Sequence, residues 1–142
     1  METINRTKIT VETTVNAPVE KVWKAFSEPE HIVNWARASD DWHAPKATND
    51  LREGGSFSTT MAAKDGSFSF EFGGIYDKVI LHSLIDYTLG DGRRVTVNFS
   101  GDEKATHVLE TFEAEDENPV EMQQGGWQAI LDNFKKYTES LA

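Results

Sequence analysis

Residues 118–137 read NPVEMQQGGWQAILDNFKKY, and this stretch decides the fold. Apolar residues in it, and one leucine beyond it, recur at helical spacing: Val120, Trp127, Ile130, Leu131, Phe134 and Leu141. Such spacing predicts one long amphipathic helix with a broad apolar stripe. The rest of the chain must bury that stripe.

The start and the middle of this helix carry separate signals. Pro119 at the first helical position, between Asn118 and Glu121, predicts a capped start. Gly125 and Gly126 lie inside the helix, where each glycine costs about 1 kcal/mol relative to alanine. We expect the sheet to approach the helix backbone closely there. The alternative is that the glycines leave room for a ligand.

Length and composition restrict the class of protein. The 142 residues suffice for one domain with a real core, which we place at residues 1–142. The formal net charge of −10 disfavours nucleic acid and membrane surfaces as partners. Without cysteine the chain has no disulfide and no thiolate chemistry. Residues 1–5 lack a basic segment followed by an apolar run, so we expect a cytoplasmic protein.

The segments ahead of the helix have the patterns of strands and short helices. Residues 8–15 alternate apolar and polar side chains, as a half-buried strand does. Pro18 then opens one short helix, and Ser27 with Glu30 opens a second. About six further strands follow, joined mostly by tight turns. This order predicts an α+β fold, with an antiparallel sheet whose apolar face packs on the C-terminal helix.

Turn positions predict how the middle strands pair. A two-residue turn at residues 65–66 sets Thr59 opposite Phe72 and Met61 opposite Phe70. One face of this ribbon is then mainly aromatic, and the other face is polar. This register predicts that the aromatic face looks toward the C-terminal helix.

Two further strands supply polar groups to the same side of the sheet. A three-residue loop at residues 90–92 puts Tyr87 on the apolar face of its strand pair. In residues 105–112 the alternation is ambiguous, because one face offers His107 and the other offers Glu110. Only one of these two side chains can point inward, and the pattern leaves the choice open.

Several short motifs resemble a known family. They are residues 16–26 (NAPVEKVWKAF), 29–31 (PEH) with Trp35, 52–57 (REGGSF), 90–93 (GDGR), and 125–127 (GGW) with 130–134 (ILDNF). In this order they resemble the START-like superfamily (SRPBCC, birch-pollen-allergen-like), in the branch homologous to the activator of the ninety-kilodalton heat-shock protein ATPase. The resemblance covers nearly the whole chain. It implies the helix-grip fold, a curved seven-stranded antiparallel sheet around the long C-terminal helix, with two short helices after the first strand and often a cavity.

Motifs of catalytic, nucleotide and metal sites are missing from the sequence. There is no G-x-S-x-G elbow, and the GDG stretch at residues 90–92 lacks the third glycine of a dinucleotide loop. The 4 histidines are scattered, without the helical spacing of a zinc site. We therefore predict no catalytic residue, no metal and no cofactor.

What remains is aromatic and apolar. The 4 tryptophans and 8 phenylalanines exceed what a small core needs. The candidates for a ligand-binding inner surface are Trp35, Trp42, Phe57, Thr59, Phe70, Phe72, Tyr87, Phe99, Trp127, Ile130 and Phe134. Because a pocket is usually apolar with a few polar groups, Thr59, Tyr87 and either His107 or Glu110 would supply the polar groups.

Three functions fit these observations. The first, which we favour, is non-enzymatic binding of a small hydrophobic or aromatic molecule between the sheet and the C-terminal helix. The second is an enzyme of the polyketide cyclase or aromatase type that some START-like relatives represent. The third is binding of a chaperone partner, as the family name suggests. The chain matches only the START-like portion of the eukaryotic activators, so chaperone activation does not follow from the resemblance.

Overall fold

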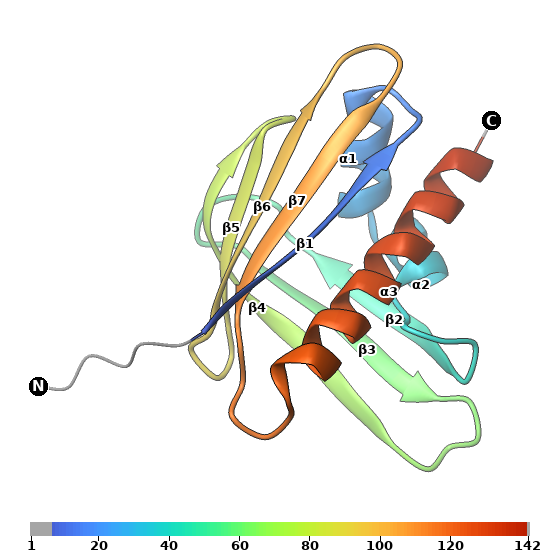
Figure 1. The fold of residues 1–142 in the computed structure, drawn as a ribbon, viewed down its shortest axis with the longest axis vertical. Helices are drawn as coiled ribbons and strands as arrows, with labels where there is room; N and C mark the ends of the chain where they lie inside the picture. The colour runs from blue at the N-terminus through green and yellow to red at the C-terminus, as the bar shows by residue number, and fades with distance from the viewer. Residues whose placement is uncertain (1–6, 142) are drawn as a thin grey trace, which may run out of the picture.

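The fold combines one curved antiparallel sheet with three helices, in a computed structural model that describes residues 7–141. In chain order the elements are β1 (Lys8–Val15), α1 (Val19–Ser27), α2 (Pro29–Trp35), β2 (Trp42–Asn49), β3 (Ser56–Ala63), β4 (Ser69–Ile80), β5 (Leu84–Leu89), β6 (Arg94–Gly101), β7 (Thr106–Glu113) and α3 (Val120–Ser140). The strand order is β1-β7-β6-β5-β4-β3-β2, and α3 crosses the concave side of the sheet (Figure 1). The predicted α+β helix-grip fold is confirmed.

Some sequence expectations extend past the described part of the chain. The domain proposed for residues 1–142 includes residues 1–6 and 142, which lie outside the described residues. The expectation about targeting at residues 1–5 lies there too. Among the described helices, none combines the length and apolar character that a membrane crossing needs.

The predicted strand registers are confirmed. Thr59 pairs with Phe72 and Met61 with Phe70 across β3 and β4. In the next hairpin Tyr87 is buried on the inner face, as the three-residue loop predicted. Turn chemistry and alternation therefore sufficed to place these side chains on the concave face.

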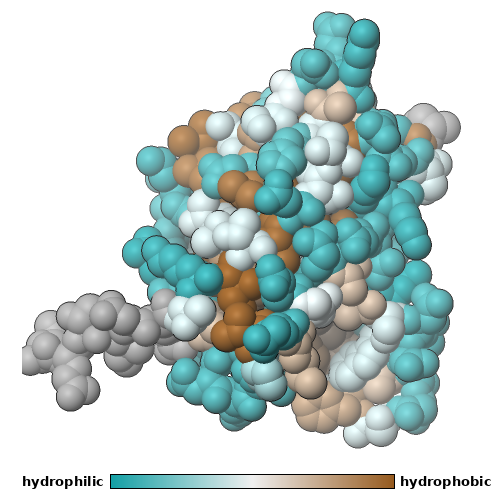
Figure 2. Space-filling model, viewed as in Figure 1, coloured by the Kyte–Doolittle hydropathy of each residue, from teal (hydrophilic) through white to brown (hydrophobic). Residues whose placement is uncertain are grey.

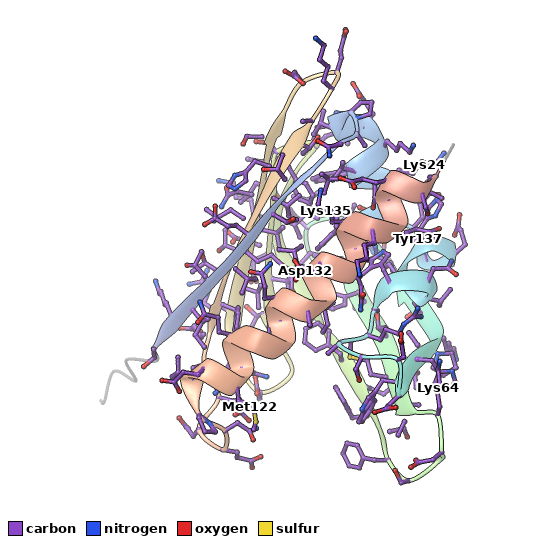
Figure 3. All side chains as sticks on the ribbon, turned by 45° about the vertical axis from the view of Figure 1, so that its right-hand side comes forward. Lys24, Lys64, Met122, Asp132, Lys135 and Tyr137 are labelled. Atoms are coloured by element: carbon purple, nitrogen blue, oxygen red, sulfur yellow. The ribbon has the colours of Figure 1, made fainter. Side chains whose placement is uncertain are left out.

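The long helix lies along the edge strand β1. Three of its side chains donate hydrogen bonds to backbone carbonyl groups of β1: Gln124 to Thr10 (3.3 Å), Gln128 to Glu12 (3.0 Å) and Lys135 to Thr14 (2.9 Å). Figure 3 shows Lys135 on the side of α3 that faces this strand. Because β1 ends the sheet, these contacts satisfy carbonyl groups that no neighbouring strand reaches.

Trp127 connects α3 to the inner face of the sheet. Its ring stacks on Phe112 of β7, with 3.8 Å between ring centroids and 10° between ring planes. It also meets the ring of Phe72 edge-on, at 5.8 Å. The sequence predicted a buried Trp127 against the sheet. The contact is as predicted, but the side chain remains partly exposed.

The helices α1 and α2 close the other end of the concave face. Phe26 of α1 stands edge-on to Phe99 and to Phe134, at 5.4 Å in each case. Trp35 of α2 meets Phe134 at 5.0 Å, and its indole N–H donates to the carbonyl of Ala25 at 2.9 Å. A buried indole that keeps its hydrogen bond adds apolar area without leaving a polar group unpaired. These rings form a packed aromatic floor.

Two expectations about helix starts are wrong. Pro119 is the N-cap of α3, and Asn118 makes no side-chain cap; its backbone N–H instead donates to the carboxylate of Glu115 at 2.7 Å. The N-cap of α2 is Glu28, not Ser27, and it too makes no side-chain cap hydrogen bond. In both places a proline stands at the helix start and fixes the backbone there without such a cap.

The expected reason for the glycines in α3 is also wrong. A Cβ atom added to Gly125 or to Gly126 would meet nothing within 4 Å. No part of the sheet therefore approaches the helix backbone at these positions. The space beside both glycines is open, and Gly125 is exposed on the surface. The close approach occurs instead at Gly74 in β4, where an added Cβ would lie 2.2 Å from the carbonyl oxygen of Thr88.

These two glycine environments predict opposite effects of the same substitution. Gly125→Ala should raise the free energy of unfolding by about 0.5–1 kcal/mol, because alanine favours the helix and its methyl group meets open space. Gly74→Ala should lower it, because the methyl group collides with Thr88. Urea unfolding followed by tryptophan fluorescence measures both. A destabilised Gly125→Ala variant would contradict the open environment.

Candidate functional site

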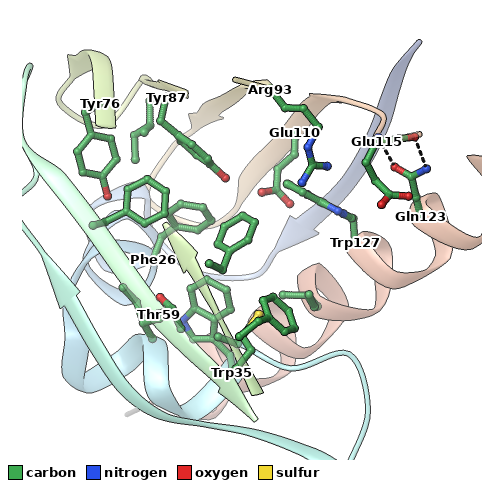
Figure 4. A pocket seen from close by; sticks show the side chains of 18 of the residues that line it. Phe26, Trp35, Thr59, Tyr76, Tyr87, Arg93, Glu110, Glu115, Gln123 and Trp127 are labelled. Atoms are coloured by element: carbon green, nitrogen blue, oxygen red, sulfur yellow. Dashed lines mark hydrogen bonds between the residues drawn. The ribbon is translucent and has the colours of Figure 1, made fainter. Parts of the chain in front are cut away.

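A cavity of about 340 Å³ lies between the concave face of the sheet, α2 and the first half of α3 (Figure 4). It exists because α3 follows β1 at one side of the sheet while α2 covers β2 at the other. The inner faces of β3, β4 and β5 lie between these two helices. Their side chains line the cavity together with residues of both helices.

Most of the predicted ligand-binding residues meet at this cavity. The lining includes Trp35, Phe57, Thr59, Phe70, Phe72, Tyr87, Trp127 and Ile130. Thr59 and Tyr87 are almost fully buried, whereas Phe70 is 42% exposed and stands at the opening. Their role in ligand binding stays a prediction.

The other three predicted residues do not line the cavity. Phe99 and Phe134 belong to the aromatic floor beneath it, and both are buried by other rings. Trp42 begins β2 and packs edge-on to Phe68 and Phe70 at 6.1 and 6.0 Å, without itself lining the cavity. Periodicity identified the apolar face correctly, but it could not tell a residue under the cavity from one beside it.

Several lining residues were not among the candidates. They are Phe26, Ile32, Ala36, Thr48, Met61, Tyr76, Ile85, Arg93, Glu115, Asn118 and Gln123. The predicted register already put Met61 on the inner face, so this residue could have been named. Arg93 lies between β5 and β6, and Gln123 lies in the first turn of α3. The sequence has no pattern that shows how these two segments come together at the cavity.

The structure decides between the two possible inward residues of β7. Glu110 points inward and is 8% exposed. His107 points outward, where its Nε2 lies 2.9 Å from the Glu12 carboxylate. The inner side of β7 is thus formed by Thr106, Val108, Glu110 and Phe112, all of them buried.

Glu110 is an acid in apolar surroundings. Burial raises its pKa from 4.5 to about 8, since the charged form loses its hydration. Within residues 7–141 its carboxyl has neither a hydrogen-bond partner nor an ion-pair partner. It is therefore largely neutral at pH 7. A buried polar group without a partner costs about 1–3 kcal/mol, so this residue lowers the stability of the empty protein.

The two tyrosines of the cavity differ in their hydrogen bonding. The Tyr76 hydroxyl donates to the side-chain carbonyl of Asn49 at 2.5 Å, and burial raises its pKa. The Tyr87 hydroxyl has no hydrogen-bond partner in the described part of the chain. Burial first, and then the nearby Glu110, raise the pKa of Tyr87 well above its ordinary value. Both hydroxyls therefore stay protonated.

The opposite end of the cavity is more polar. The side chain of Gln123 holds the loop between β7 and α3: it accepts from the backbone N–H of Glu115 at 2.9 Å and donates to the carbonyl groups of Glu115 and Asn118. Arg93 donates from Nε to the Asp91 carboxylate at 2.8 Å. In the lower half of Figure 2, apolar residues reach the surface beside the first turns of α3. Among the described residues, no group of His, Asp or Glu could hold a metal ion.

A curved antiparallel sheet that grips a long C-terminal helix over a cavity defines a START-like protein of the helix-grip fold. The sequence model for "Activator of Hsp90 ATPase homolog 1-like protein" matches residues 16–139, and the chain belongs to this family. Membership agrees with the observed fold, and it leaves the ligand open.

Solved structures agree with this assignment. The solution structure of the AHSA1-like protein from Aeromonas hydrophila is 42% identical, with a TM-score of 0.88, covering 94% of this chain and 93% of that one. A protein from Cytophaga hutchinsonii is 58% identical, with a TM-score of 0.80 and coverage of 93% and 92%. A crystal structure from Chromobacterium violaceum shares the fold at 22% identity, with a TM-score of 0.84 and coverage of 95% and 99%. No curated protein matches the sequence significantly.

The raised pKa of Glu110 predicts a pH-dependent stability. The group binds its proton more tightly in the folded state than in the unfolded state, so its contribution is complete below about pH 4.5 and is lost as the pH rises through about 8. Relative to Glu110→Gln, the wild-type free energy of unfolding should fall by up to about 1.4 kcal/mol per pH unit in this window. Urea unfolding of both proteins at several pH values measures the difference. If the free energies of unfolding of the two proteins changed with pH in parallel, Glu110 would not be a buried, neutral acid.

Proposed function

We propose that the protein binds one small, mainly apolar or aromatic molecule in the cavity between the sheet and α3, without catalysing a reaction. The observation that carries the proposal is the cavity itself. Its volume of about 340 Å³ lies within the range of roughly 300–1,000 Å³ that small-molecule pockets have. Protein interiors are close-packed and rarely hold voids much larger than one water. A space of this size is typical of a ligand site.

The lining of the cavity supports an apolar ligand. Aromatic rings come from α1 and α2, from β3, β4 and β5, and from α3. Flat rings on several sides suit a flat, aromatic or hydrophobic molecule better than a sugar or a nucleotide. Nucleic acid and membrane surfaces remain poor partners for a chain of net charge −10.

A second candidate, proton-transfer catalysis of the cyclase type, is favoured by Glu110 alone. An acid with a pKa near the working pH is what general acid–base catalysis uses. At pH 7, however, a pKa of about 8 leaves roughly a tenth of the groups ionised, and no second residue orients the carboxyl. A panel of polyketide and ester substrates tests this candidate. Turnover that Glu110→Gln abolishes, with the fold intact, would promote it over simple binding.

Chaperone binding ranks third. The family description names an activator of Hsp90 ATPase, and that activity belongs to the protein that it describes. The cavity does not require a protein partner. We therefore do not extend chaperone activation to this chain.

Binding to the cavity can be tested with a pair of matched substitutions. Thr59 lines the cavity, whereas its neighbour Thr60 is on the outer face and donates to the Glu71 carboxylate at 2.6 Å. Thr59→Phe should fill the space and weaken binding of the neutral probe N-phenyl-1-naphthylamine at least tenfold. Thr60→Phe should leave binding unchanged. Fluorescence titration, with the stoichiometry taken from the saturation point, measures both.

Two results would count against the proposal. Unsaturable probe binding, or equal affinity in Thr59→Phe and Thr60→Phe, would show adsorption to the exposed apolar surface. Native mass spectrometry of protein purified without detergent gives an independent check. One small molecule retained per chain, and lost from Thr59→Phe, is the expected outcome.

A further inference from the structure

Two polar groups in the apolar wall of the cavity have no hydrogen-bond partner among the described residues. They are the carboxyl of Glu110 and the hydroxyl of Tyr87, and no hydrogen bond joins them to each other or to another described residue. Both residues are buried, at 8% and 6% exposure. The other tyrosine of the cavity, Tyr76, is already bonded to Asn49. Tyr87 and Glu110 therefore each carry an uncommitted O–H group, and Thr59 carries a third elsewhere in the lining.

The sheet brings the two groups to one place. Tyr87 is on β5 and pairs with Val95, and Glu110 is on β7 and pairs with Val97. The two strands are separated only by β6, whose inward residues between them are these two valines. Figure 4 shows the hydroxyl and the carboxyl converging on the same part of the cavity from neighbouring positions. The effect of Glu110 on the Tyr87 pKa agrees with this proximity.

Both groups present O–H donors to the cavity. Neutral Glu110 donates from its carboxyl, and Tyr87 donates from its hydroxyl. The remaining titratable groups of the lining are Tyr76, Arg93 and Glu115. Tyr76 is occupied by Asn49, the Nε of Arg93 by Asp91, and Glu115 accepts from the backbone of Asn118. Tyr87 and Glu110 are thus two O–H donors at neighbouring inner positions of the sheet, and the guanidinium of Arg93 lies beside them.

We propose that Tyr87 and Glu110 together hold one carbonyl oxygen of the bound molecule, so that the cavity selects flat, mainly apolar ketones over hydrocarbons of the same shape. This inference rests on the proposed binding function. Two donors aimed at one oxygen in a site without bulk water bind it more strongly than either donor does in water. A hydrocarbon in the same place leaves both donors unpaired and loses that interaction.

The experiment compares 2-acetonaphthone with 2-ethylnaphthalene, which has a similar shape and no oxygen. Dissociation constants come from tryptophan fluorescence titration at pH 6.5. The wild-type protein should bind the ketone at least tenfold more tightly. Tyr87→Phe and Glu110→Leu should each remove most of that preference, with the affinity for 2-ethylnaphthalene unchanged or improved. Tyr76→Phe is the matched control and should keep the preference, because its hydroxyl is bonded to Asn49.

A pH series separates a donor role from a merely structural one. Ionised Glu110 has no proton to donate, so wild-type affinity for the ketone should fall as the pH passes about 8. Tyr87→Phe should keep this pH dependence, and Glu110→Leu should lose it. Circular dichroism and urea unfolding establish that each variant is folded.

Different outcomes would contradict the paired-donor site and the proposed binding function. Equal affinity of the wild-type protein for both probes, or an undiminished preference in Tyr87→Phe and Glu110→Leu, would overturn the paired-donor site and leave apolar binding intact. Failure of both probes to bind saturably would overturn the proposed function as well.

Discussion

The contact between α3 and the edge strand β1 determines the position of the helix over the sheet, and with it the place of the cavity. Side chains of α3 donate to carbonyl groups along β1, and Trp127 stacks on Phe112 of the next strand. The helix is thereby held over one side of the sheet. The sheet is too wide for one helix to cover, and α2 covers the opposite edge. The space that remains over β3, β4 and β5 is the cavity.

In this arrangement the aromatic contacts stabilise the fold, whereas the cavity lowers its stability. The aromatic floor around Phe134 and the stack of Trp127 on Phe112 bury large apolar areas. The cavity lacks such packing, and it contains the unpaired acid Glu110. A ligand that fills the space and accepts a hydrogen bond would relieve both costs. Stability and function are thus coupled, because a ligand that binds only the folded state raises the free energy of unfolding.

The sequence predicted most of the fold, because turns and alternation are local signals. The hairpin around residues 65–66 fixed which side chains of β3 and β4 face inward. Local signals could not decide between His107 and Glu110, because each face of β7 carries both polar and apolar residues. The glycines at 125–126 were misinterpreted for a related reason. A glycine in a helix signals either close approach or open space, and only the tertiary arrangement shows which.

The central claim is that a small molecule binds inside the fold, between the sheet and α3. The most direct test is the set of intermolecular nuclear Overhauser effects between bound 2-acetonaphthone and assigned methyl groups. Ile85 and Ile130 line the cavity, whereas Ile75 and Leu81 are surface residues that are 54% and 67% exposed. We expect cross-peaks to Ile85 and Ile130 and none to Ile75 and Leu81. Cross-peaks confined to the two surface residues would contradict it.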